Sequence, residues 1–408
     1  MSAILTVFYS LSLTVFALGL LTLAYYPLSL IFALRKPRLP VFHSGPDPLV
    51  SVIVPGYNES KVVGSCIESI LASDYPNFEI ILVDDGSSDD TLAVMKTFEA
   101  DQRVRVIGKR NGGKASALNA GIVAAHGEIL FFVDADGLFT PSAIREMLNG
   151  FRTEKVGAVC GNDAPVNLDR IQTRLASIQT HVGTGFVRRA LALINCLPIV
   201  SGNIGAFRRS VIDKTGPFLE GFIGEDLELT WRVHKAGFQV NFAPLAVVLA
   251  EVPSTVKDLW KQRVRWARGL LQTIRIHKKM MFNSRYGLFG MYLPIIVTSM
   301  IIIPLLQLVI VILLPVLAVA GQSPIPLSVF GVIGWLGLIM SLAATIFAIA
   351  LNHAWKDLRY IYTVLFWVPY SLMMNVVTLW ALVLEMRGAR SEWNKLDRTG
   401  VITRRSMD

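Results

Sequence analysis

Acidic and amide side chains follow three apolar runs in the first half of the chain. Asn58 and Glu59 come after LVSVIVPGY, Asp85 comes after FEIILVD, and Asp134 and Asp136 come after EILFFV. Runs of this kind are typical of buried parallel strands, whose carboxyl ends meet at one edge of a sheet, where ligands bind. Three acidic strand ends on one edge therefore predict a binding site.

The residue types favour a hard cation at this edge. The six histidines form no HExxH-like cluster, and the three cysteines are scattered without a CxxC pair. These patterns argue against a structural zinc site and a disulfide framework, and they favour a metal held by carboxylates and phosphate. Strand alternation alone would send Asp134 and Asp136 to opposite faces, so the turn at Asp136-Gly137 must re-aim one of them. The alternative for this pair is a surface turn with helix-capping aspartates.

The elements that must position these residues alternate along the middle of the chain. Short β-branched runs alternate with helical patterns, which predicts an α/β fold with a parallel sheet covered on both faces. Residues 166–195 are expected to be helical, and a core-facing helix and a helix at the membrane interface both remain open. No GxGxxG or GxxxxGK[ST] loop is present, which argues against a dinucleotide dehydrogenase or a P-loop ATPase. Strands are expected within 49–59, 78–91, 104–109, 128–137 and 156–162.

The composition indicates a membrane protein with one polar domain. Of the 408 residues, 53% are hydrophobic and 17% charged, and the mean hydropathy is +0.51. Residues 3–34 carry no charge and precede Arg35, Lys36 and Arg38, which predicts a retained anchor with its C-terminal end in the cytoplasm. Further apolar stretches lie near 287–320, 325–352 and 360–385. The expected organisation is an anchor at 1–35, a catalytic domain at 48–285, transmembrane helices at 286–386 and a basic tail at 387–408.

The basic residues fit this membrane placement and leave one conflict. The net charge is +9, and a basic tract between 257 and 285 is explained as the cytoplasmic flank of the next span, so nucleic-acid binding is not expected. The anchor plus three spans places the C-terminus outside, yet the basic tail favours the cytoplasm. One apolar stretch is then interfacial or re-entrant, and 287–320, which contains three prolines, is the first suspect.

Six short motifs in a fixed order resemble the processive family-2 glycosyltransferases. They are VPGYNE (54–59), VDDGSSDDT (83–91), NGGKASALNAG (111–121), DAD (134–136), GED (224–226) and QRVRW (262–266). The group includes cellulose, chitin, hyaluronan and poly-N-acetylglucosamine synthases. The resemblance runs from about 50 to 270 and implies a GT-A fold, that is, a Rossmann-like, mostly parallel sheet, in a cytosolic domain beside transmembrane helices.

The resemblance implies a role for each motif. Asp226 would be the general base of an inverting transfer, with Glu225 in support, and the family most often has Thr where Gly224 stands. The metal would be Mg²⁺ or Mn²⁺, held by Asp136 with Asp134. Acceptor contacts are expected from Glu225, Trp266, Ser201 and Gly202. Donor contacts are expected from Pro55, Tyr57, Asn58, Glu59, Asp85, Lys114, Asp134, Gln262 and Arg265.

Residues that flank the shared motifs resemble those of synthases that make one particular polymer. The segments LWKQRVRWARG (259–269) and IGAFRRS (204–210) are similar to those of poly-β-1,6-N-acetylglucosamine synthases, which make a biofilm exopolysaccharide. The implied partners are a UDP-sugar, preferably UDP-N-acetylglucosamine, a growing polysaccharide, the bilayer of the plasma or inner membrane and a small accessory membrane protein; assistance in export is also implied. The alternatives are a chitin- or hyaluronan-type synthase, a non-processive transferase that adds one sugar to a membrane lipid, and a channel or transporter with a vestigial sugar-binding domain.

Overall fold

A mixed eight-stranded sheet lies at the centre of the polar domain. The computed structural model describes residues 3–35, 47–322 and 327–389, and most of the basic tail predicted at 387–408 lies outside them. The sheet order is β3-β2-β1-β4-β7-β6-β8-β5. The strands are β1 (Val50–Gly56), β2 (Phe78–Asp84), β3 (Val104–Gly108), β4 (Ile129–Phe132), β5 (Leu138–Phe139), β6 (Val156–Pro165), β7 (Gly205–Arg208) and β8 (Gln239–Ala250).

One half of the sheet is parallel, as expected from the sequence. Strand β1 pairs in parallel with β2 and β4, and β2 pairs in parallel with β3. The other half is mixed, because β7 is antiparallel to both β4 and β6, and β5 is antiparallel to β8. The expected parallel strands are confirmed, whereas β5, β7 and β8 were not predicted. Two of these are very short, which leaves little periodicity to recognise.

Both faces of the sheet are buried. Alternate residues of neighbouring strands contribute to two separate apolar clusters, with Ile53 and Leu130 in one and Val52 and Phe131 in the other. This two-sided burial explains why the parallel strands are almost continuously apolar in sequence. Polar side chains can then collect only at the strand ends, which places the candidate site at the edge of the sheet.

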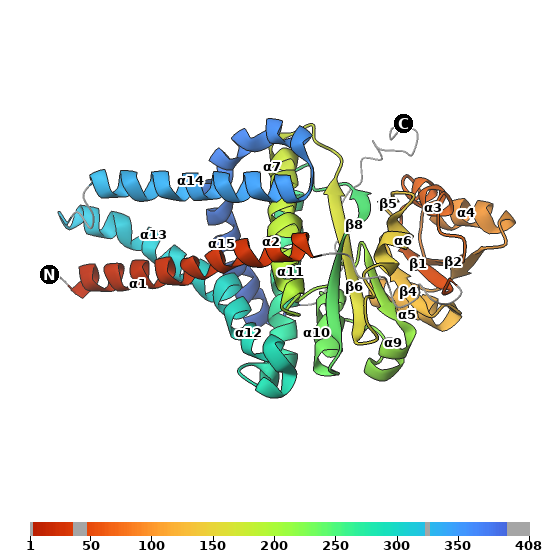
Figure 1. Ribbon diagram of the computed structural model, residues 1–408. Helices are drawn as coiled ribbons and strands as arrows, with labels where there is room; N and C mark the ends of the chain where they lie inside the picture. The colour runs from red at the N-terminus through yellow and green to blue at the C-terminus, as the bar shows by residue number, and fades with distance from the viewer. Residues whose placement is uncertain (1–2, 36–46, 323–326, 390–408) are drawn as a thin grey trace.

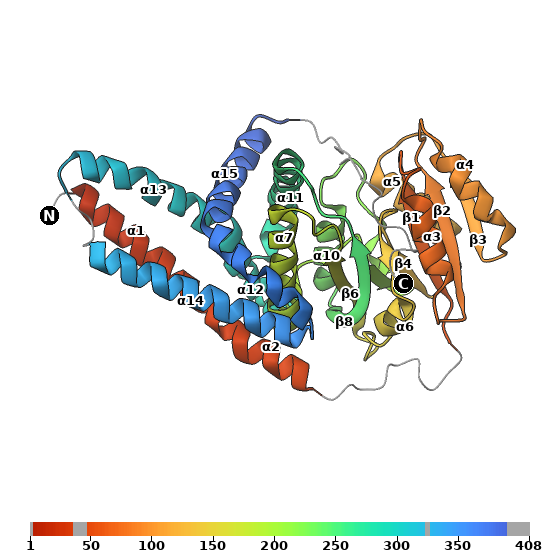
Figure 2. The same ribbon diagram turned by 90° about the horizontal axis from the view of Figure 1, so that it is seen from above.

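Helices cover the sheet and extend away from it. Figures 1 and 2 show α1, α13 and α14 projecting together from one end, the sheet at the other, and α7 and α11 between them. The α-helices are α1 (Ala3–Leu20), α2 (Tyr25–Leu34), α3 (Val63–Leu71), α4 (Thr91–Lys96), α5 (Lys114–Ala124), α6 (Ala143–Leu148), α7 (Ile171–His181), α8 (Arg189–Leu193), α9 (Arg209–Thr215), α10 (Glu225–Lys235), α11 (Val256–His277), α12 (Gly287–Val297), α13 (Ile303–Val319), α14 (Leu327–Leu351) and α15 (Trp367–Met386).

The helix expected between 166 and 195 is confirmed, with one irregularity. It consists of α7, the π-helical segment η4 (Val182–Arg188) and α8. Ile178 and Phe186 are buried, and α7 and η4 contact the C-terminal helical region. The segment therefore packs between the domain and the membrane helices. Single π-helical turns of this kind are frequent at functional sites.

Three helical segments are long and apolar enough to cross a membrane. They are Ala3–Leu34, Ser284–Val319 and Trp355–Met386, and a shorter apolar run, Trp335–Leu351, lies in α14. The segment suspected of re-entry, 287–320, is helical as far as Val319. Its π-helical part η7 (Thr298–Ile302) follows Pro294 by one turn, so the backbone adjusts locally at the proline and the helix continues.

Helix α11 is joined to the end of the last of these segments by buried polar contacts. Arg268 Nε lies 2.6 Å from Glu385 Oε1, and Arg268 also donates to the carbonyl oxygen of Ala389 at 2.6 Å. Gln272 Nε2 donates to the same Glu385 oxygen at 3.0 Å. The Arg268 side chain is almost fully buried, and a buried charge needs a partner of opposite charge. The carboxylate of Glu385 supplies one.

We predict that Glu385→Gln destabilises the protein, because it removes the Glu385 carboxylate charge that lies against the buried Arg268 guanidinium. The expected cost is about 1–3 kcal/mol, the range for a hydrogen bond to a charged group. The readout is the midpoint of thermal unfolding in detergent. The control is Asp169→Asn, which breaks an exposed pair with Arg170 at 3.6 Å and should leave the midpoint unchanged. Equal midpoints for both variants and the wild type would contradict the prediction.

Candidate active site

Asp85 organises the loop that precedes helix α5. It is buried at the end of β2, and its oxygens accept hydrogen bonds from Lys109 Nζ at 2.7 Å, from Gly113 N at 2.7 Å and from Gly112 N at 3.0 Å. Gly113 has a φ of +87°, a left-handed conformation that glycine adopts without strain. Asp85 thus fixes the first turn of α5, where Lys114 lies.

Lys114 connects carboxylates from two distant segments. Its Nζ lies 2.5 Å from Asp134 Oδ1 and 3.5 Å from Glu225 Oε1. Burial disfavours the charged form of Lys114, but the carboxylates of Asp134, Glu225 and Asp226 outweigh it and raise the pKa of the lysine. The side chain is therefore a cation at neutral pH, held among acids in the centre of the site.

The two aspartates after β4 share a common neighbourhood. Asp134 and Asp136 are half-buried on either side of the buried Ala135, in a turn closed by a hydrogen bond from Gly137 N to the carbonyl oxygen of Asp134 at 3.0 Å. Burial raises the pKa of the Cys66 thiol, and the charges of Asp136, Asp134 and Glu59 raise it further. All three carboxylates therefore lie near enough to the Cys66 thiol to act on its pKa.

These residues fit a metal that is shared with a diphosphate. Among the described residues, no group of three or more His, Cys, Asp or Glu side chains could hold a metal by itself. Mg²⁺ and Mn²⁺ sites on nucleotides commonly use one or two carboxylates and complete their shell with phosphate oxygens and water. Asp136 and Asp134 provide that donor set.

Asp226 lies in the first turn of helix α10 and is half-buried in the site. Its Oδ2 accepts a hydrogen bond from Gly202 N at 3.1 Å, and its Oδ1 accepts one from Leu227 N at 2.8 Å. Burial and the neighbouring Glu225 raise its pKa to about 6, against the opposing effects of Lys114 and the two N–H groups. A carboxylate with this pKa is unprotonated at neutral pH and can still accept a proton efficiently, which suits a general base.

Gly224, where the resembling family most often has Thr, lies against helix α11. It has a φ of +90°, and a Cβ built on it would lie 3.0 Å from the Cα of Gly269. Gln272 Oε1 also accepts a hydrogen bond from Ile223 N at 3.3 Å. The two glycines allow the loop before Asp226 and helix α11 to approach backbone to backbone, which gives this departure a structural reason.

The contacts of α11 show which of its faces points toward the site. Gln262, Arg265, Gly269 and Gln272 are spaced by three and four residues and therefore lie on one face of the helix. Since Gly269 and Gln272 contact the loop before Asp226, the half-buried Gln262 and Arg265 extend that face by two turns. Trp266 lies beside this face, is 52% exposed, and has the guanidinium of Arg263 over its ring at 4.3 Å.

The remaining predicted site residues lie at the same sheet edge. Pro55 is buried within β1, and Tyr57 follows that strand, half-buried. Asn58 Oδ1 accepts a hydrogen bond from Ser88 N at 2.7 Å, which ties the loops after β1 and β2 together. Ser201 Oγ lies 3.5 Å from Asp163 Oδ1 in the loop that also contains Gly202. The structure thus gathers the predicted residues, and their individual roles stay predictions.

Three site residues were missed by the sequence analysis. Asp163, near the end of β6, is bound by Arg188 Nη2 at 3.1 Å and by Asn203 Nδ2 at 3.3 Å. Burial opposes the charge of Arg188, but Cys160, Asp163 and Asp226 raise its pKa, so a second cation lies near the candidate base. Asp163 could have been found from the sequence. It follows the apolar run VGAVCGN, just as Asp85 and Asp134 follow their apolar runs.

Comparison with known proteins agrees with this geometry. Residues 51–216 match the family model described as "Glycosyl transferase family 2". These residues belong to glycosyl transferase family 2. The family-2 match contains Asp85, Lys114 and the Asp134–Asp136 turn, and it ends before Asp226 and α11.

Similar proteins extend the comparison beyond the matched domain. The chain is 33% identical over 222 residues to poly-β-1,6-N-acetyl-D-glucosamine synthases of Staphylococcus epidermidis and Staphylococcus aureus, which covers 54% of this chain and 54% of each relative. It therefore spans about half the length of the curated relatives it matches. A mannosyltransferase from Pyrobaculum calidifontis in complex with GDP-mannose and Mn²⁺ shares the fold, with a TM-score of 0.69 at 21% identity, over 95% of this chain and 100% of that one. The predicted GT-A fold class is confirmed.

We predict that Gly224→Ala costs more stability than Gly221→Ala. Both glycines have a left-handed φ, so each substitution costs about 1–2 kcal/mol in backbone strain. At Gly224 the new methyl group would meet the backbone of Gly269. At Gly221 no atom lies within 4 Å of the new methyl group. Thermal unfolding in detergent measures both variants. Equal losses would show that the contact between Gly224 and Gly269 is not tight.

Proposed function

We propose that this chain is a membrane-embedded inverting glycosyltransferase that extends a polysaccharide from a UDP-sugar. The observation that carries the proposal is the contact of Lys114 with Asp134 and Glu225, because it joins the predicted diphosphate site to the predicted acceptor site. The family-2 match supports glycosyl transfer. A transferase must hold the acceptor oxygen about 3–3.5 Å from the donor carbon. The two predicted sites meet this need, because the ammonium group of Lys114 contacts a carboxylate of each.

The chemical step follows from the residues on the two sides of Lys114. The acceptor hydroxyl oxygen attacks C1 of the donor sugar and forms the new glycosidic bond. The bond from C1 to the phosphate oxygen breaks, and its electron pair leaves with UDP. Asp226 takes the proton of the acceptor hydroxyl, and the N–H of Gly202 holds that carboxylate in place. Lys114 offers its charge to the diphosphate, and Arg265 adds a second cation from α11.

Asp136 and Asp134 would hold Mg²⁺ or Mn²⁺ on the diphosphate. When bound, the metal acts as a Lewis acid that stabilises the negative charge of the leaving UDP. Asp85 holds the loop before Lys114 through the N–H of Gly113 and, in the proposed complex, lies beside the uracil. The Mn²⁺ in the mannosyltransferase structure is consistent with this metal, although that likeness concerns the fold alone.

The donor and product are proposed from the curated relatives. UDP-N-acetylglucosamine is the preferred donor and poly-β-1,6-N-acetylglucosamine the preferred product, because the relatives matched at 33% identity are synthases of that polymer. Repeated addition is supported by Gln262, Arg265 and Trp266 on α11, next to the loop that contains Asp226. The three apolar helical segments support a membrane location. That the domain faces the cytoplasm stays a prediction, which rests on the basic flank of the first segment. Assistance in export and an accessory membrane protein stay predictions.

Incubation with single donors tests this proposal. Purified full-length protein with Mn²⁺ or Mg²⁺ should release UDP from UDP-N-acetylglucosamine and form a polymer that β-1,6-specific hydrolysis degrades. Parallel reactions contain UDP-glucose, UDP-glucuronate with UDP-N-acetylglucosamine, or GDP-mannose. A product with one added sugar on lipid would contradict processivity. Polymer formation from another donor alone, or none from UDP-N-acetylglucosamine, would contradict the preferred sugar.

We predict that transfer depends on the ionisation of Asp226. Because its pKa is raised to about 6, the rate should be constant above this pH and fall about tenfold per unit below it, as the base becomes protonated. Asp226→Asn should abolish UDP release at every pH. Control variant Asp213→Asn, which removes an exposed carboxylate of α9, should keep the wild-type profile.

The stability of Asp226→Asn separates a catalytic role from a folding role. A raised pKa means that the charged carboxylate opposes folding above pH 6, so this variant should unfold at the same or a higher temperature than the wild type at pH 8. UDP release that survives in Asp226→Asn would show that the base is assigned wrongly. A lower unfolding temperature would contradict the raised pKa.

A further inference from the structure

A cavity of about 580 Å³ lies on the side of the sheet away from the candidate active site. It is bounded by the C-terminal end of α2, the loop before β6, the end of α8 and the start of β8. The cavity lies beside Val156 at the amino end of β6, whereas Asp163 lies seven residues further along that strand. At about 3.3 Å per residue, the two places are roughly 23 Å apart.

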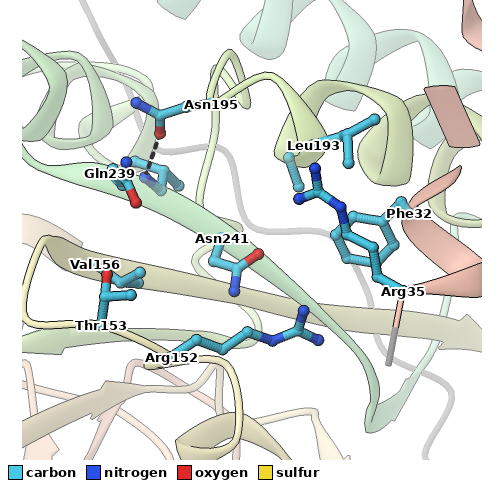
Figure 3. Close-up of a pocket in the computed structure, with 11 residues that line it drawn as sticks. Phe32, Arg35, Arg152, Thr153, Val156, Leu193, Asn195, Gln239 and Asn241 are labelled. Carbon is cyan, nitrogen blue, oxygen red and sulfur yellow. Dashed lines mark hydrogen bonds between the residues drawn. The ribbon is translucent and has the colours of Figure 1, made fainter. Parts of the chain in front are cut away.

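The charged groups of this cavity are two arginines. Among the residues that the structure describes, Arg35 and Arg152 are the ionisable ones that line it, and none of the lining residues is acidic. Figure 3 shows both guanidinium groups extending into the space beside Phe32 and Asn241. The guanidinium of Arg152 also lies 5.9 Å from the centre of the Phe32 ring. The cavity is therefore electropositive and suits an anion.

The polar groups beside the arginines do not oppose an anion. Asn195 Oδ1 accepts a hydrogen bond from Val240 N at 3.0 Å, drawn in Figure 3, and Asn241 Oδ1 accepts one from Phe242 N at 2.9 Å. Asn241 Nδ2 donates to the carbonyl oxygen of Gly150 at 2.7 Å. Backbone N–H groups thus occupy the amide oxygens of Asn195 and Asn241, which are turned to the protein and leave the positive charge of the two arginines in the cavity.

The position of the cavity indicates where such an anion comes from. Arg35 directly follows Ala3–Leu34, a helical segment of spanning length, and Phe32 is in the last turn of that segment. The cavity thus opens where a spanning helix leaves the apolar layer, at the depth of lipid phosphates. Apolar side chains of Phe32, Ala192 and Leu193 form part of its wall and can contact the glycerol and the first methylene groups of an acyl chain.

We propose that this cavity binds the phosphate headgroup of an anionic glycerophospholipid, with Arg35 and Arg152 as its phosphate ligands. The site is distinct from the proposed donor and acceptor sites and does not rest on the proposed function. Bound lipid would join the end of the first span to the loop before β6, because Arg35 and Arg152 come from these two parts of the chain. Basic pockets next to spanning helices are a recognised mode of binding anionic lipids.

Lipid titration of the full-length protein tests the proposal. Native mass spectrometry in neutral detergent measures the binding of phosphatidylglycerol and phosphatidylcholine. The wild type should bind phosphatidylglycerol more tightly, and Arg152→Gln should weaken that binding by at least about tenfold. Arg152 is the cleaner probe, because Arg35 also belongs to the basic flank of the span. The matched control is Arg285→Gln, which removes an exposed arginine at the start of another span, outside the cavity.

A second variant separates loss of lipid binding from a folding defect caused by the substitution of Arg152. Thr153→Glu adds a carboxylate to the wall of the cavity, leaves Arg152 in place and should weaken phosphatidylglycerol binding to a similar extent. The thermal unfolding midpoint of each variant is measured without lipid, and only variants within a few degrees of the wild type are compared.

Four results would overturn the proposal. The first is equal binding of the two lipids by the wild type. The second is an equal loss in Arg285→Gln, which would indicate general surface charge. The third is unchanged binding in Thr153→Glu. The fourth is binding of glycerol phosphate, the headgroup without acyl chains, as tightly as phosphatidylglycerol, because a soluble phosphate compound would then be the ligand.

Discussion

The candidate site depends on one buried ammonium group among carboxylates. Lys114 contacts Asp134 from the β4 turn and Glu225 from the start of α10, and the charge of Asp226 also acts on it. Without this cation, three acids from segments about 90 residues apart would repel one another in a buried space, at a cost that grows as water is removed. The same constraint explains the rest of the arrangement: Asp85 fixes the loop before Lys114, and the Gly202 N–H holds Asp226.

The membrane segments and the site are connected through helix α11. Its Gly269 and Gln272 contact the loop before Asp226, and its Arg268 and Gln272 contact Glu385 at the end of α15. The position of the candidate base is therefore set partly by a spanning helix. Under the proposed function, this connection would couple the acceptor site to the apolar helical segments.

The sequence predicted the parallel half of the sheet and the residues at its edge because both follow local rules. Apolar runs ending in Asp85 and Asp134 identify a strand and its polar end at once. The short antiparallel strands β5 and β7 have too few residues for a period, and Asp163 and Arg188 meet only through tertiary folding. The close approach of Gly224 to Gly269 was likewise hidden, because it joins two positions 45 residues apart and needs the backbone of both.

The most direct test of the central claim is a structure of Asp226→Asn with UDP-N-acetylglucosamine and Mn²⁺. In that complex we expect the uracil beside Asp85, the diphosphate and metal at Asp134 and Asp136, and the sugar on the side of residue 226. Lys114 should contact the diphosphate in that complex. A nucleotide bound elsewhere on the molecule, or a diphosphate at this edge of the sheet that contacts neither aspartate, would contradict the account.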